Sequence, residues 1–357
     1  MRRRLLQALA GLVVSGAALW LTLRGKDLGA IWGAMRGADY RYLALYVPFW
    51  LAIHLARTLR WGILLEPVAK VPWKRLNAAS AVGWMALVLL PFRLGEFARP
   101  YLVAERPQLR VSAALSSVVV ERVADGIFTA VLMIVALLAL PQGLPGAALL
   151  KTGGYVVGLI FLALLLFLVG AYRNRRAAVA LAQKLLAPIA PKLAARAAGM
   201  LDAFIQGLRL VTSPAKLVQF FLLTAVYWGA NGWGMQVLAR GFGLPLDATQ
   251  SATLLGALVI GVTIPAGPGM VGTFQGAVVL GLGLFFPREV VAVHGVAYAN
   301  VLWAAQLAFQ VALGMAYLFS RHIQLARILS APEEVAEGLE QEEAEAGAAA
   351  SPGVTPR

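Results

Sequence analysis

The chain has 357 residues, of which 60% are hydrophobic and 13% are charged, whereas a typical soluble domain carries about 25% charged residues. Together with a mean hydropathy of +0.75, this composition excludes a soluble domain and predicts an all-α polytopic membrane protein. The chain has no cysteine and only three scattered histidines, so we expect neither a thiol site nor a zinc site.

The net charge of +14 is unevenly distributed. Seven glutamates lie in residues 333–345, whereas the first 330 residues hold the other ten acidic residues and 30 lysines and arginines. In a membrane protein this excess first indicates topology, because cytoplasmic loops collect basic residues. Attraction to anionic lipid headgroups is a second interpretation. No nucleic-acid-binding motif accompanies the charge, so we expect no nucleic-acid partner.

Long apolar runs predict about six full spans. The first, residues 5–23, follows a basic start, an outline that a cleaved signal peptide shares. Because its 19 residues approach the ~20 of a spanning helix, we interpret it as an uncleaved span with a cytoplasmic N-terminus. The other spans are expected at residues 42–65, 112–140, 155–172, 217–238 and 290–319.

Two further apolar segments, residues 78–103 and 251–286, are interrupted by proline and glycine. In each, an apolar run meets a proline (Pro91 or Pro265) and then glycine and phenylalanine. Irregular backbone at membrane depth is tolerated only where protein buries it or where it lines a water-filled cavity. We therefore predict two opposed re-entrant hairpins that form an inverted repeat.

The remaining segments are predicted to lie outside the membrane. Residues 173–216 hold eight lysines and arginines against one aspartate, which predicts a basic cytoplasmic segment. Residues 331–357 are acidic and rich in alanine and glycine, which predicts a disordered tail. The membrane domain is then residues 1–330, and the basic loops place both termini in the cytoplasm.

Arg57 and Arg60 lie three residues apart late in the second span, and hence on one helix face. One interpretation is that both side chains extend to the inner headgroups. The other is that they face a polar cavity and bind a phosphate, which suits the planar guanidinium group.

Arg93, Glu96 and Arg99 recur every three residues after Pro91, beside Gly95. Glu96 can pair with either arginine, so the group is either an interfacial ion-pair cluster or a headgroup site at the hairpin tip. The proline break favours a cavity.

Glu121, Arg122 and Asp125 lie about ten residues into a predicted span, too deep to reach the headgroups easily. We expect them to pair with neighbouring helices, and Arg57 or Arg93 are the candidate partners. The group is either a structural ion-pair network or a site linked to a proton or a headgroup, because adjacent carboxylates can share a proton.

The second break contains Gly267, Gly269 and Gly272 between and after two prolines, which prevents a regular helix. It predicts a tight turn, and the backbone N–H groups near Gly272 are also a candidate anion site. Candidate lining residues from the preceding span are Asn231, Trp228 and Trp233.

No catalytic signature accompanies these residues. The chain lacks the nucleophile elbow, the phosphate-binding loop and the HExxH pattern. We therefore expect no cofactor and no enzymatic activity.

Four stretches, "RTLRW", "LPFRLGEFARPYLV", "ERVADG" and "IPAGPGMVGTF", resemble the lysylphosphatidylglycerol synthase transmembrane (flippase) family in order and spacing. The resemblance covers about residues 5–325 and implies a membrane protein with two re-entrant hairpins that moves lipids between leaflets. The matching site positions are Arg93, Gly95, Glu96, Arg99, Glu121, Arg122, Asp125, Pro265, Gly267, Gly269 and Gly272. Many relatives carry a carboxylate where this chain has Gln275. The soluble synthase half of the best-known members is missing here, so aminoacyl transfer is not expected.

The leading hypothesis is a translocase for a lipid with an anionic or phosphate-bearing headgroup: a phospholipid, a glycolipid or a polyprenyl-phosphate lipid. An intramembrane transferase with Glu96 or Asp125 as the base is an alternative. A scaffold that binds a lipid-modifying membrane enzyme through the acidic tail is another, and the sequence also leaves a homo-oligomer open.

Overall fold

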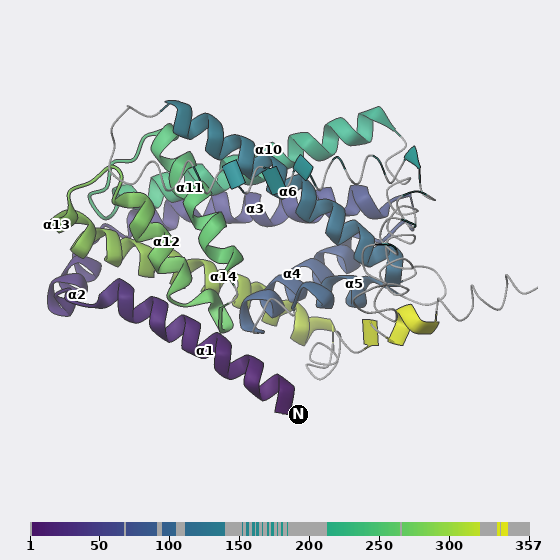
Figure 1. Ribbon diagram of the computed structural model, residues 1–357, viewed down its shortest axis with the longest axis horizontal. Coiled ribbons are helices and arrows are strands. Elements are labelled where there is room, and N and C mark those ends of the chain that lie inside the picture. Colours follow the sequence, from purple (N-terminus) through teal and green to yellow (C-terminus); the bar gives the residue numbers. More distant parts are fainter. Residues whose placement is uncertain are drawn as a thin grey trace, which may run out of the picture.

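In the computed structural model, the described residues form helices and no strand (Figure 1). These residues are 2–67, 69–90, 95–104, 111–139, 213–264 and 266–321, with scattered positions in 152–184 and 334–341. The helical class predicted from composition is confirmed. The elements are α1 (Arg2–Leu23), α2 (Leu28–Arg36), α3 (Arg41–Leu65), α4 (Trp73–Leu89), α5 (Ala98–Val103), α6 (Val111–Ala139), α10 (Pro214–Arg240), α11 (Ala248–Thr263), η2 (Pro268–Met270), α12 (Thr273–Leu282), α13 (Arg288–Val290), η3 (Val291–Gly295) and α14 (Val296–Arg321).

Helices occupy five of the six predicted spans, with ends within a few residues of those expected: α1, α3, α6, α10 and α14. The sixth predicted span, residues 155–172, and the basic segment 173–216 lie mostly outside the described residues. Between α1 and α3, where no element was predicted, the short helix α2 begins at Asp27, whose carboxylate accepts from the Ala30 N–H at 3.0 Å. This is an ordinary N-cap.

Helices α3 and α10 form the long central pair (Figure 1). They are antiparallel: Glu66 at the end of α3 pairs with Lys216 at the start of α10 at 2.7 Å. At the other end, the Asp39 N–H donates to the Gly241 carbonyl at 2.9 Å. The pair thus defines two opposite ends of the molecule.

Both predicted broken segments form helical hairpins. In the first hairpin α4 packs on α5, and in the second α11 packs on α12, with η2 at the turn. The first begins just after the end of α3 and the second just after the end of α10, so they start at opposite ends of the central pair (Figure 1). Helix α4 also packs on α14, and helix α11 packs on α6.

Close backbone approach in the first hairpin depends on Gly95. A Cβ atom at this position would lie 2.1 Å from the Leu87 backbone nitrogen. Any side chain would therefore push the break away from α4. The predicted role of Gly95 as part of the turn has this steric basis, while Pro91 and Arg93 lie outside the described residues.

The distribution of polarity is inverted relative to a soluble protein. Arg60 and Glu121 are fully buried, at 0% exposure, while Leu55, Leu59 and Leu222 are exposed on the outer faces of α3 and α10. Charged residues are almost never buried in soluble proteins unless they are paired. Among the described residues, two helical stretches, Arg41–Leu65 and Arg288–Ser320, are long and apolar enough to cross a bilayer. An apolar exterior around a charged interior is the arrangement expected in lipid.

Part of the acidic tail is helical in the structure. Positions 334–335 and 337–341 are helical, and Val335 is only 2% exposed. The Tyr101 hydroxyl on α5 donates to the Glu334 carboxylate. Burial of Val335 and the hydrogen bond from Tyr101 thus help to hold these positions, although the composition of the segment is typical of disorder.

Candidate functional site

A cavity of about 430 Å³ lies inside the bundle. Both hairpins contribute to its wall: Trp84 and Glu96 come from the first hairpin, and Gly269 and Phe274 from the second. Helices α3, α6, α10 and α14 close the remaining sides. The volume is within the usual range of small-molecule sites.

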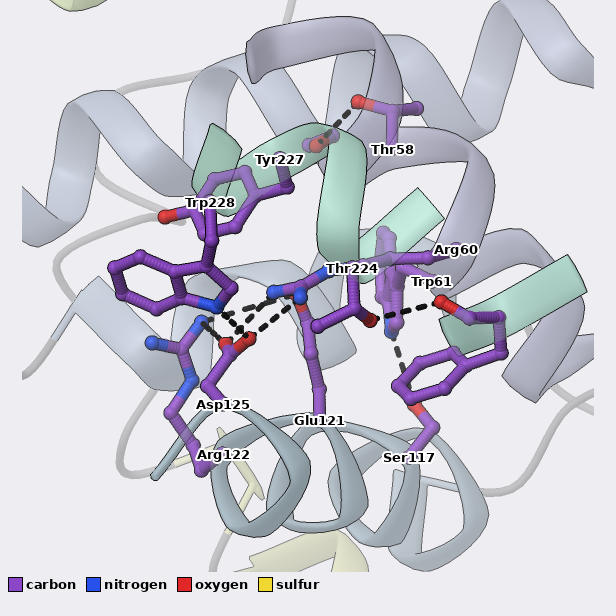
Figure 2. Close-up of polar contacts among 12 residues, drawn as sticks. Thr58, Arg60, Trp61, Ser117, Glu121, Arg122, Asp125, Thr224, Tyr227 and Trp228 are labelled. Carbon is purple, nitrogen blue, oxygen red and sulfur yellow. Dashed lines mark hydrogen bonds and ion pairs between the residues drawn. The ribbon is translucent and has the colours of Figure 1, made fainter. Parts of the chain in front are cut away.

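Arg60 is the centre of the charged group beside this cavity (Figure 2). Its Nη1 donates to Asp125 Oδ1 at 2.5 Å, and its Nη2 donates to Asp125 Oδ2 at 2.7 Å and to Glu121 Oε1 at 2.8 Å. The Trp228 indole N–H also donates to Asp125 Oδ1, at 3.1 Å. One guanidinium thus joins α3 to two carboxylates of α6. Arg60 is fully buried in this ion-pair network and is not among the residues that line the cavity.

The observed partner of the α6 carboxylates on α3 differs from the predicted one, while the other candidate, Arg93, lies outside the described residues. Arg57 was a candidate, but Arg60 is the residue that pairs, because the helix face that meets Glu121 and Asp125 carries Arg60. The Arg60 guanidinium donates to both carboxylates, so a positive charge lies between them. Breaking such a buried pair on one side leaves an uncompensated charge, which is strongly destabilising.

Arg99 on α5 pairs with Glu121, with 3.0 Å between Nη1 and Oε2. Glu96, which by its spacing could pair with either Arg93 or Arg99, lines the cavity together with Arg122. Arg122 is 28% exposed and lies 3.8 Å and 3.9 Å from oxygens of Glu121 and Asp125. The sequence motif containing Glu96 and Arg99 therefore contributes one residue to the ion-pair network and one to the cavity wall.

The ring of Trp84 lies against three arginine guanidinium groups, and Trp84 was not among the site residues predicted from the sequence. Its ring lies 4.4 Å from the Arg57 guanidinium carbon, 5.1 Å from that of Arg122 and 5.2 Å from that of Arg99. A cation over an indole face is attracted by the ring quadrupole, and the attraction strengthens when water is excluded. A tryptophan in an apolar run looks like an ordinary core residue, so no signal in the sequence identified it.

Arg57 is buried and lines the cavity, so it does not extend to the headgroups. Its Nη2 lies 3.2 Å from His54 Nδ1, and His54 Nε2 lies 2.8 Å from Asn77 Oδ1. The Asn77 amide in turn donates to the Tyr317 hydroxyl at 2.6 Å. These hydrogen bonds hold the Arg57 guanidinium group in position. His54 precedes Arg57 by three residues, and that spacing could have indicated it.

The second hairpin divides its glycines between two roles. Gly269 lines the cavity, and its carbonyl accepts from Trp303 Nε1 at 2.7 Å. Gly267 instead faces α1, where its N–H donates to Ser15 Oγ at 2.9 Å. Pro265 lies outside the described residues.

The predicted anion site near Gly272 has internal partners in the structure. The Gly272 N–H donates to Gln275 Oε1 at 2.7 Å, which is a local helix cap. Gly272 has φ +84, and a Cβ there would lie 2.5 Å from the Leu19 nitrogen of α1. Gln275 is thus buried as a cap, and among the described residues it is not part of the cavity wall.

Of the three lining candidates on α10, the structure places two in the cavity wall. Asn231 and Trp228 line it, whereas Trp233 is 61% exposed. Helix α11 contributes aliphatic residues to the wall, with Leu255, Leu258 and Val259. The cavity is therefore lined by charged, aromatic and aliphatic side chains. Among the described residues no cluster suits a metal ion.

Comparison with known proteins adds one match. No curated protein matches the chain, and no solved structure does. A family model described as "Lysylphosphatidylglycerol synthase TM region" matches residues 8–314, a range that contains every residue of the cavity wall named above. This is the family that the four sequence motifs resemble, and the chain belongs to the lysylphosphatidylglycerol synthase transmembrane-region family.

Proposed function

We propose that this protein is a multi-pass lipid translocase that moves a polar-headgroup lipid between leaflets. The headgroup occupies the cavity on the side of Arg57 and Arg122, and the acyl chains remain near the aliphatic wall of α11. The observation that carries the proposal is a cavity lined by both charged and aliphatic side chains, between two broken hairpins of a membrane-family protein.

The two hairpins give the proposal a route for alternating access. At 17 and 16 residues, α4 and α11 extend only about 24–26 Å, less than the ~30 Å hydrocarbon core. We propose that both are re-entrant, that they enter from opposite sides, and that they are the two copies of an inverted repeat. The corresponding contacts of α4 with α14 and of α11 with α6 support this arrangement. Both termini are then cytoplasmic, as the basic loops indicate.

Transferase chemistry has less support from the geometry. Asp125 was one candidate base, but both its oxygens accept from Arg60 and one also accepts from Trp228. Both oxygens of Asp125 are therefore already occupied by donors from the protein. Mass spectrometry of lipids from cells with and without the protein checks this point, because a transferase would produce a modified lipid.

The direct test is lipid movement in proteoliposomes. The purified chain should move fluorescent phospholipid between leaflets, and Glu96→Ala should slow that movement at least several-fold, because Glu96 lines the cavity. Glu289→Ala is the matched control, since Glu289 is an exposed carboxylate on α13. Failure of the wild-type protein to move any lipid, with intact folding, contradicts the proposal.

A further inference from the structure

The charged side of the cavity is specific for one kind of headgroup. We infer that it selects lipids whose headgroup carries a phosphodiester with no added ammonium group, and that it rejects aminoacylated, cationic lipids. This inference rests on the proposed function and narrows its substrate class.

The first observation is the state of the two cavity arginines. Arg57 forms no ion pair with any described carboxylate, and its Nε is buried without a hydrogen-bond partner among the described residues. Arg122 approaches Glu121 and Asp125 only at 3.8 Å and 3.9 Å, beyond hydrogen-bond distance. Both guanidinium groups therefore have donors for a ligand anion. Guanidinium groups bind phosphate oxygens in a planar, bidentate way.

A third donor comes from Trp84. This residue is only 7% exposed and lines the cavity, yet its indole N–H has no acceptor in the described part of the chain. A buried donor without a partner costs about 1–3 kcal/mol. A phosphate oxygen in the cavity would supply the acceptor.

The second observation is that the α6 carboxylates are already engaged. Asp125 accepts from Arg60 and Trp228, and Glu121 is shared between Arg60 and Arg99. An ammonium headgroup would have to displace a buried arginine to reach either of them. The loss of a buried pair opposes such an exchange.

Two of the neighbouring aromatic rings, Trp84 and Tyr227, are engaged too. Arg57, Arg99 and Arg122 surround the ring of Trp84, and Arg60 lies 4.5 Å from the ring of Tyr227. Proteins that bind alkylammonium groups use free aromatic faces for the purpose. Beside this charged group those two rings already hold cations.

The third observation is the charge balance of the described site. Its charged members are Arg57, Arg60, Arg99 and Arg122 with Glu96, Glu121 and Asp125. Among these described groups one positive charge is in excess, and Arg57 is the arginine without an ion pair. A phosphodiester carries a single negative charge and compensates it, whereas like charges brought together cost binding free energy.

The test compares three fluorescent lipids in proteoliposomes: phosphatidylglycerol, lysylphosphatidylglycerol and a glycosyl diacylglycerol without phosphate. Phosphatidylglycerol should move at least about tenfold faster than the other two, a difference of ~1.4 kcal/mol. Arg57→Gln should remove this preference, Arg57→Lys should retain part of it, and Arg240→Gln on the exposed end of α10 should not change it.

The outcomes separate the two proposals. Movement of lysylphosphatidylglycerol as fast as phosphatidylglycerol overturns the inference and leaves the translocase standing. No movement of any lipid overturns the translocase, and the thermal shift of the wild-type chain in detergent then decides the inference. Short-chain phosphatidylglycerol should raise the melting temperature more than its lysyl ester does, and the opposite order would overturn the inference.

Discussion

Replacement of Arg60 by methionine tests whether the buried ion-pair network supports the fold. Methionine has a similar length and no charge, so Arg60→Met removes three hydrogen bonds of 2.5, 2.7 and 2.8 Å without a large cavity. In this variant Glu121 still pairs with Arg99, and Asp125 still accepts a hydrogen bond from Trp228, so each carboxylate retains one partner. Removal of one partner from a buried pair costs about 3–5 kcal/mol, and we expect a loss in this range.

A matched control separates the effect of burial on stability from the effect of ion-pair distance. Lys216 lies 2.7 Å from Glu66, the same distance as Arg60 Nη2 from Asp125 Oδ2, but its side chain is 42% exposed. Exposed pairs contribute about 0–1 kcal/mol, so Lys216→Met should change stability little. Any difference between the two variants then measures the effect of the buried environment.

The assay is unfolding of the purified protein in mild detergent, followed by circular dichroism over a denaturant series. Asp125→Asn in the Arg60→Met background should cost less than it does alone, with a coupling free energy of about 1–3 kcal/mol. Additive losses, or a cost for Arg60→Met no larger than that for Lys216→Met, would refute the reasoning.

Three further outcomes follow from the described contacts. Trp84→Ala should slow lipid movement more than Trp84→Phe, which keeps an aromatic face for the three guanidinium groups, in the same proteoliposome assay. Gly272→Ala should loosen the packing of α1, because its Cβ would lie 2.5 Å from the Leu19 nitrogen at φ +84, and hydrogen exchange of residues 11–23 reports it. Tyr101→Phe should release the tail helix, since it removes the hydroxyl that donates to Glu334, and faster exchange at residues 334–341 would show this.

The long helices were predictable because hydropathy integrates over many residues. The span predicted at residues 42–65 differs from Arg41–Leu65 by one residue, since an uninterrupted apolar run leaves little choice of ends. The two breaks were predictable for the opposite reason: proline and glycine remove helical hydrogen bonds or favour positive φ wherever they occur. Helix α2 was missed because nine residues give too short a pattern.

The pairing of charged residues inside the site was harder to predict from the sequence. Arg60 and Asp125 are separated by 65 positions, and the choice between Arg57 and Arg60 depends on how α3 is rotated against α6. A single sequence does not specify that rotation. The hairpin glycines show the same limit, because Gly269 faces the cavity while Gly272 faces α1, although both belong to one motif.

The two hairpins are held by different interactions, and this bears on how a headgroup could act on them. Arg99 of the first hairpin reaches Glu121, the carboxylate that Arg60 also holds, so its position depends on a balance of charges. The second hairpin is held by close backbone contact of Gly272 with α1 and by a hydrogen bond from Trp303 to Gly269, which are neutral contacts. A phosphate bound as proposed would change the electrostatic balance around Arg122 and Trp84, and it would therefore act more strongly on the first hairpin than on the second. Because a ligand shifts a conformational equilibrium only through contacts that differ between states, the charged hairpin is the one expected to respond to headgroup binding.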